Sequence, residues 1–133
     1  MTVQSLDHVN IITPRLDETA TFYTALLGLE RRDPPHPLTP QQALWMHDER
    51  GHPVLHLNAA DCPRRFDRAF TSPEPAGAIH HVALACSGYD DTIARIERLG
   101  LDYQIGGLAS IKLRQLFVFD PNGVLLELNF HSS

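Results

Sequence analysis

The chain carries an internal repeat whose two copies begin and end with similar short segments. Residues 6–9 (LDHV) are echoed by residues 79–82 (IHHV), and residues 54–58 (VLHLN) by residues 125–129 (LLELN). Self-similarity at a nearly constant offset predicts two equivalent supersecondary units rather than one irregular fold. An approximate two-fold relation between such units would bring corresponding side chains of the two copies into a shared cleft.

Hydrophobic periodicity predicts a β-α-β-β-β order in each copy. In the first copy, Pro14 suits the start of a helix and Gly28 suits its end. In the second copy, the helix ends at Gly100 and the last turn is the strong signal Asp120-Pro-Asn-Gly123. The expected strands are 5–12, 43–48 and 53–58, then a strand from residue 79, and 101–105, 112–119 and 124–130.

The 133 residues are of ordinary size for one domain, and the 43% hydrophobic content is typical of a globular protein. We therefore predict a single α+β domain over residues 1–133, made of repeats 5–58 and 78–130. Residues 59–77 are rich in proline and charged residues and are the predicted linker, with at most a short helix at 66–70.

Strand parity tests the repeat, because side chains two residues apart lie on the same face of a strand. On the last predicted strand apolar residues alternate with Glu127, and on its counterpart they alternate with His56. The same parity places His81, rather than the neighbouring His80, on the face away from the core. Its repeat counterpart is His8.

Four metal-capable side chains thus share the predicted non-core face at equivalent repeat positions. Imidazole and carboxylate groups together bind Zn, Ni, Co, Fe or Mn, so the sequence predicts a site for one divalent ion. Such an ion can act as a Lewis acid on a carbonyl or an enediolate. His56 and Glu127 are also the candidate catalytic residues. The predicted metal ligands are His8, His56, His81 and Glu127.

Four further side chains are predicted to contact a substrate. Met46, Gln115 and Phe117 are assigned the parity of the cleft face, and Asn10 lies on the first strand of that face. Asn10, Asn58 and Asn129 have two alternative interpretations, as groups that orient metal ligands or as ordinary polar residues at the edge of a cleft.

Composition excludes some partners. Eleven basic and sixteen acidic residues give a net charge of -5, and Lys112 is the single lysine, which does not favour nucleic acid. No apolar stretch approaches the roughly 20 residues that span a bilayer, and the first residues do not resemble a signal peptide. We expect a cytoplasmic protein with no membrane association, and we expect Cys62 and Cys86 to be free thiols.

These segments resemble the vicinal oxygen chelate superfamily, also called the glyoxalase/bleomycin resistance/dioxygenase superfamily. The resemblance covers nearly the whole chain and rests on residues 6–9, 22–29, 79–82 and 119–128. It implies two βαβββ modules, each an incomplete barrel, with a divalent metal in the cleft between them. It also implies a small-molecule substrate and a homodimer, in some members with ligands from both chains.

The metal positions of the superfamily match His8, His56, His81 and Glu127. In glyoxalase I the position of His56 is a glutamate, which binds the metal and helps to move the substrate proton. In fosfomycin-resistance thiol transferases and extradiol dioxygenases, the metal is held at positions matching His8, His81 and Glu127, a 2-His-1-carboxylate set suited to Fe(II).

The resemblance leaves three functions open. The first is a divalent-metal-dependent, glyoxalase-like lyase or isomerase, which chelates vicinal oxygens of a small substrate and stabilises an enediolate-like intermediate. The second is an Fe(II) extradiol-type dioxygenase acting on a catechol. The third is a non-catalytic small-molecule-binding protein of the bleomycin-resistance type, although the retained metal set argues against it.

Overall fold

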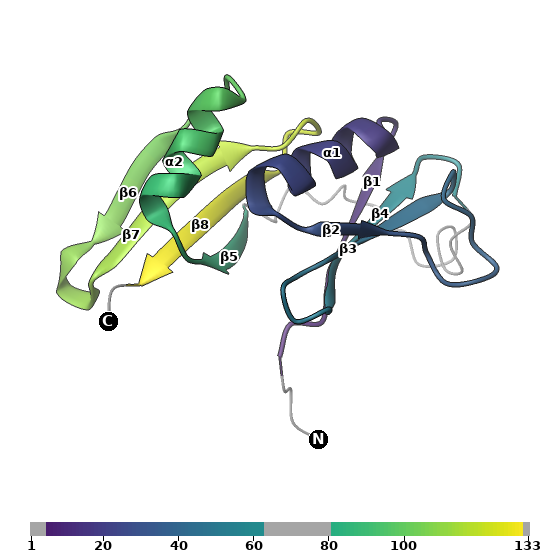
Figure 1. Cartoon of the computed structure of the whole chain (residues 1–133), viewed down its shortest axis with the longest axis horizontal. Coiled ribbons are helices and arrows are strands. Elements are labelled where there is room, and N and C mark those ends of the chain that lie inside the picture. Colours follow the sequence, from purple (N-terminus) through teal and green to yellow (C-terminus); the bar gives the residue numbers. More distant parts are fainter. Residues whose placement is uncertain (1–4, 63–80, 132–133) are drawn as a thin grey trace, which may run out of the picture. The chain divides into compact units, whose positions relative to one another are not determined.

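A computed structural model divides the chain into two compact units, residues 1–64 and 65–133. The structure describes residues 5–62 and 81–131, so most of the predicted linker, including its short helix at 66–70, lies outside the described residues. Each unit has its own sheet and its own helix (Figure 1). That the two units form one domain stays a prediction.

Unit 1 contains a four-stranded mixed sheet and one helix. The strand order is β1-β4-β3-β2, in which β1 runs parallel to β4 and the other neighbours are antiparallel. The first and last strands of the unit therefore lie side by side. The elements are β1 (Val9–Thr13), α1 (Leu16–Leu27), β2 (Glu30–Arg32), β3 (Ala43–His47) and β4 (Pro53–Ala59).

Unit 2 repeats this topology. Its sheet has the order β5-β8-β7-β6, again with the first and last strands parallel. The α+β fold of two βαβββ modules, predicted from the repeat, is thereby confirmed. The elements are β5 (Val82–Cys86), α2 (Tyr89–Arg98), β6 (Gln104–Leu108), the 3-10 turn η1 (Ala109–Ile111), β7 (Leu113–Phe119) and β8 (Leu125–His131).

The apolar residues of β4 and β8 alternate as predicted and form the core of each unit. Leu57 and Leu128 are completely buried, and in unit 1 the helix α1 lies across this side of the sheet with Tyr23 also completely buried (Figure 1). In unit 2, Ile96 of α2 is completely buried as well. Because the helix covers one face of each sheet, alternation leaves the intervening residues on the opposite face.

The last hairpin of each unit turns in the same way. Asp48 Oδ1 accepts hydrogen bonds from the amides of Arg50 and His52, both at 2.9 Å. In unit 2, Asp120 Oδ1 accepts from the amides two and four residues further on, at 2.7 and 2.8 Å. Gly51 and its counterpart in unit 2 both adopt a φ of +80°, which a side chain disfavours. The repeat therefore extends to the turns.

Two predicted strands have boundaries that differ from the observed ones by more than one residue. The first strand begins at Val9 rather than residue 5, and β6 covers Gln104–Leu108 instead of 101–105. The expected break at Gly106-Gly107 is part of the strand. A Cβ atom on Gly106 would lie 2.8 Å from Cε2 of Phe117, so glycine is required because the neighbouring strand carries an aromatic ring against it.

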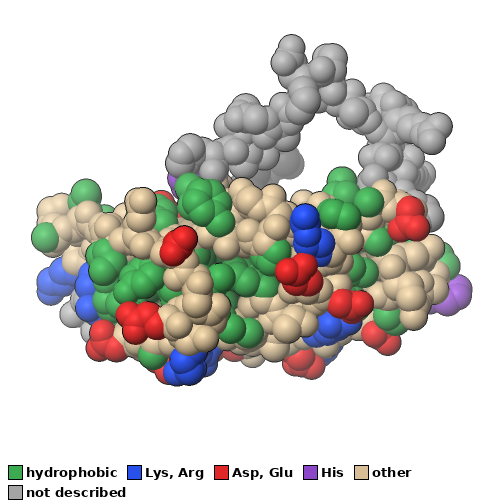
Figure 2. Space-filling view, turned by 90° about the horizontal axis from the view of Figure 1, so that it is seen from above, with side chains coloured by type: hydrophobic (Ala, Val, Ile, Leu, Met, Phe, Trp, Pro, Cys, Tyr) green, Lys and Arg blue, Asp and Glu red, His purple; other side chains and the backbone are tan. Residues whose placement is uncertain are grey.

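Neither described helix is long and apolar enough to cross a membrane. On the face drawn in Figure 2, acidic and basic side chains are interspersed rather than gathered by sign. Both described cysteines are free thiols, with Cys62 buried and Cys86 half-buried, as predicted.

Candidate functional site

His56 and Glu127 occupy the same position in their respective sheets. The ladder between β1 and β4 pairs Asn10 with His56, and the ladder between β5 and β8 pairs Ala83 with Glu127. Both residues alternate with buried leucines and so lie on the face opposite the core. The equivalence inferred from the sequence repeat is therefore present in the backbone register.

In unit 1 the structure brings His8 and His56 together as part of a stack of three rings. The ring centroids of His8 and His56 are 3.7 Å apart with an interplanar angle of 12°. The indole of Trp45 stacks on the other face of His56 at 3.8 Å and 8°. His56 is therefore held between two aromatic rings, which restrict its side-chain rotation.

The environment of His56 disfavours its protonation. Burial, with the nearby His8 as a second cause, lowers the pKa of His56 from 6.5 to about 4. Its Nε2 atom is buried and has no hydrogen-bond partner within the described part of the chain. At neutral pH His56 is consequently a neutral imidazole, the form that binds a metal or accepts a proton.

His8 is oriented by its neighbour Asp7. Nδ1 of His8 donates a hydrogen bond of 2.6 Å to Oδ2 of Asp7, and this bond lowers the pKa of Asp7. Donation from Nδ1 leaves the lone pair of a neutral imidazole on Nε2. A histidine ligand commonly has a carboxylate on its other nitrogen in this way.

In unit 2 the structure brings His81 and Glu127 together. Nε2 of His81 lies 3.6 Å from Oε1 of Glu127, whose side chain is only 16% exposed. Oε2 of the same carboxylate accepts a hydrogen bond of 2.9 Å from Nδ2 of Asn129. Oδ1 of Asn129 in turn accepts a bond of 3.1 Å from Nε2 of Gln115. A chain of polar contacts thus crosses the sheet from β7 to the start of β5.

The imidazole and carboxylate groups of both pairs are donors that a divalent ion accepts, but only the pair in unit 2 is oriented for one ion. A metal ion bound to both His81 and Glu127 by bonds of about 2.1 Å would fit their present separation. The angle between these two bonds would be near 120°, which is close to the tetrahedral value. The nearly parallel rings of His8 and His56 cannot both aim in-plane lone pairs at one ion, so one ring would have to turn. Among residues 5–62 and 81–131, no three His, Cys, Asp or Glu side chains are grouped to hold a metal.

The prediction for Met46 was wrong. Met46 pairs with Leu55 and is completely buried on the core side, whereas Trp45 pairs with His56. The whole run from Ala43 to Met46 is apolar, so it has no alternation from which parity could be read. The repeat could have identified Trp45 as the residue on the non-core face. Phe117 pairs with Glu127 in unit 2, and Trp45 pairs with His56 at the equivalent position in unit 1.

The other predicted lining residues lie on the non-core face. Phe117 and Gln115 are half-buried on β7, beside Glu127 and Asn129 respectively. Nδ2 of Asn10 donates a hydrogen bond of 2.6 Å to Asn58, so its amide is already engaged. Contact of these residues with a substrate stays a prediction.

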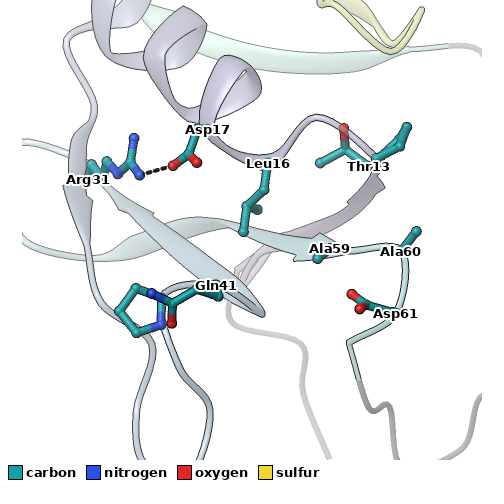
Figure 3. A pocket seen from close by; sticks show the side chains of 10 residues that line it. Thr13, Leu16, Asp17, Arg31, Gln41, Ala59, Ala60 and Asp61 are labelled. Atoms are coloured by element: carbon teal, nitrogen blue, oxygen red, sulfur yellow. Dashed lines mark hydrogen bonds and ion pairs between the residues drawn. The ribbon is translucent and has the colours of Figure 1, made fainter.

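A separate open pocket of about 600 Å³ lies in unit 1, where β1 and β4 end and α1 begins (Figure 3). An ion pair between Arg31 and Asp17 forms one wall, and Leu16 projects between the other lining residues. The described residues around it include none of the predicted site residues. The predicted residues of unit 1, among them His8 and His56, therefore do not line this pocket.

Comparison with known proteins defines the class. A family model described as the Glyoxalase/Bleomycin resistance protein/Dioxygenase superfamily matches residues 5–128. The chain belongs to this superfamily, whose members are mostly enzymes and often metal-dependent. It is 29% identical over 130 residues to the Arabidopsis thaliana protein "Glyoxylase I 4", covering 93% of this chain and 69% of that protein.

Solved structures share the fold. An integron cassette protein from the mobile metagenome of V. cholerae has a TM-score of 0.73 at 17% identity, covering 99% of this chain and 98% of its own. A glyoxalase/dioxygenase from Nostoc punctiforme has 0.72 at 17%, covering 98% and 92%. The fosfomycin resistance protein FosX from Listeria monocytogenes has 0.68 at 16%, covering 98% and 94%. At these identities the likeness extends to the fold alone.

Proposed function

We propose that the protein is a divalent-metal-dependent, glyoxalase-like enzyme of the lyase or isomerase type. The proposed ligands are His8 and His56 from one unit and His81 and Glu127 from the other. The proposed substrate is a small molecule with two adjacent oxygens, which the ion would chelate while stabilising negative charge on an enediolate-like intermediate.

The observation that carries this proposal is the equivalence of the two ligand pairs. In each unit a histidine just before the first strand lies beside a donor on the last strand, at the same register position. Core packing does not require this arrangement, because all four side chains lie on the face that the helix does not cover. Membership of a superfamily that is often metal-dependent supports the same conclusion.

The chain's own groups supply proton transfer and orientation. His56, neutral because of its lowered pKa, can accept a proton at Nε2. The indole of Trp45 stacks on its ring and restricts its rotation. Phe117, next to Glu127, would exclude water on one side of a bound substrate.

Elemental analysis of gently purified protein tests the proposal. We expect stoichiometric Ni, Zn or Co in the parent protein and loss of this metal in His8→Ala and Glu127→Ala. His36→Ala is the matched control, because His36 is exposed in a loop and is not a proposed ligand. Full metal content in both ligand variants would refute the proposed site. The loaded protein is then assayed with glyoxalase-type substrates that carry two adjacent oxygens.

A second candidate function is an Fe(II) extradiol-type dioxygenase. It is favoured by the aromatic ring of Phe117 beside Glu127 and by the stacking of Trp45 on His56, which would hold that ring and leave His8, His81 and Glu127 as the iron ligands. Oxygen uptake with catechols after anaerobic Fe(II) reconstitution would support it, and no uptake across a broad panel would refute it.

Two further measurements complete the proposal. Ligand binding that survives complete metal removal would instead indicate a non-catalytic binding protein. We also propose a homodimer, and sedimentation equilibrium with the metal-loaded protein would measure its mass directly. A monomer at micromolar concentration would refute the dimer without affecting the assignment of ligands.

A further inference from the structure

We propose that Asn129 and Gln115 are positioning residues that make Glu127 a one-oxygen ligand. The inference rests on the proposed metal site and concerns how its only carboxylate is presented. Asn129 would occupy one carboxylate oxygen, and Gln115 would fix the orientation of the Asn129 amide.

The chemistry of the groups sets the direction of each hydrogen bond. An ionised carboxylate only accepts hydrogen bonds, so Asn129 must present its Nδ2 group to Glu127. Its Oδ1 atom then faces the other way and needs a donor, which Nε2 of Gln115 provides at 3.1 Å. Reversing either amide would place two acceptors against each other. The orientation is therefore determined by Glu127 at one end and maintained by Gln115 at the other.

The two oxygens of Glu127 have different surroundings as a result. Oε2 is 2.9 Å from the amide of Asn129, whereas Oε1 is the oxygen nearest to His81, at 3.6 Å. The low exposure of the carboxylate strengthens the amide contact relative to one in bulk water. A metal ion beside His81 would thus bind Oε1 alone, which leaves a coordination position for a second substrate oxygen.

On β6, the strand next to β7, Gly106 lies against the side chain of Gln115. Gly106 pairs with Gln115, and a Cβ atom there would lie 3.2 Å from Oε1 of Gln115 and 2.8 Å from the ring of Phe117. The absence of a side chain at Gly106 therefore allows both groups to lie close to the sheet. Gln115 thus joins Phe117 as a reason for glycine at this position.

The first unit provides a matched control. Asn58 pairs with Ala43 as Asn129 pairs with Gln115, so the two asparagines have equivalent register positions. Asn58, however, bonds to Asn10 and to Sγ of Cys62 instead of a proposed ligand. Removing the amide of Asn58 should disturb packing without disturbing a metal ligand.

The test is Co²⁺ binding by the full chain, measured by chelator competition and by visible absorption. We expect Asn129→Leu, which is similar in size but has no donor, to bind Co²⁺ at least about tenfold more weakly than the parent. Its d–d bands should also weaken, because a released carboxylate binds through both oxygens and raises the coordination number. Asn58→Leu should match the parent in both measurements.

Gln115→Met tests the same chain of contacts one residue further from Glu127. It replaces Asn129→Leu as the test if that variant does not fold. It should weaken Co²⁺ binding by less than Asn129→Leu does, but by more than about twofold. Parent-like affinity and spectrum in the folded variants, or tighter binding, would overturn the inference while leaving the metal site intact. A parent protein that binds no Co²⁺ would overturn the proposed function and this inference together.

Discussion

The lowered pKa of His56 predicts a specific form of acid sensitivity in the metal-free protein. The unfolded chain protonates this histidine near pH 6.5, whereas the folded protein resists protonation until about pH 4. His56 therefore contributes stability that is fully present above pH 6.5 and is lost as the pH falls from 6.5 to about 4. Replacing it by Phe keeps a ring between His8 and Trp45 but removes the titration.

The size of the effect follows from the same values. A fall from 6.5 to about 4 sets a ceiling of about 3 kcal/mol. The His56 ring is only half-buried and its neighbour His8 is 35% exposed, so solvent screening reduces this figure. We expect the difference in unfolding free energy between parent and His56→Phe to shift by about 1–2 kcal/mol between pH 7.5 and pH 4.5, in favour of the variant.

Urea unfolding in the presence of EDTA at several pH values measures this difference. Asp48, whose lowered pKa has its causes in His52 and Arg50 and not in His56, is shared by both proteins and cancels in the comparison. Parallel loss of stability in parent and variant from pH 7 to pH 4.5 would refute the reasoning. An NMR titration that finds the pKa of His56 near 6.5 would refute it independently.

The remaining predictions concern the core, a turn and metal linkage. Leu57→Ala and Leu128→Ala should each lower the unfolding free energy by about 2–5 kcal/mol, measured by urea unfolding, because both side chains are completely buried. Backbone amides lower the pKa of Asp48, so its stabilising effect is lost as the pH falls through that lowered pKa. Asp48→Asn should therefore show a flatter acid limb of stability by thermal unfolding. Saturating Zn²⁺ should raise the Tm of the parent but not of His8→Ala, because only a ligand-bound folded state is stabilised.

The repeat made the sheet topology and the position of His56 and Glu127 predictable. Leucine alternates with polar residues over 55–58 and over 126–129, so parity has one solution there, and the observed register agrees with it. The same reasoning failed for Met46, because four consecutive apolar residues in β3 satisfy either parity. A one-residue shift reverses the face of every side chain, which is why Trp45 was missed.

Contacts between side chains could not be predicted from the sequence. Stacking of His56 between two rings depends on the strand register that places Trp45 opposite His56. Periodicity does not reveal this register. The orientation of Asn129 depends on Gln115, a residue on another strand. The sequence predicts a break at Gly106-Gly107 because glycine usually weakens strands, but Gly106 lies within the strand and accommodates a neighbouring ring.

The parallel pairing of the first and last strands has a consequence for how the protein folds. His8 and His56 are separated by most of unit 1, as are His81 and Glu127 by most of unit 2, yet each pair becomes adjacent when these strands meet. Closing so long a loop costs chain entropy, and such contacts form slowly. The two pairs of proposed ligands thus arise only when a module has closed completely, and a truncated chain that lacks β4 or β8 would lack one of these pairs.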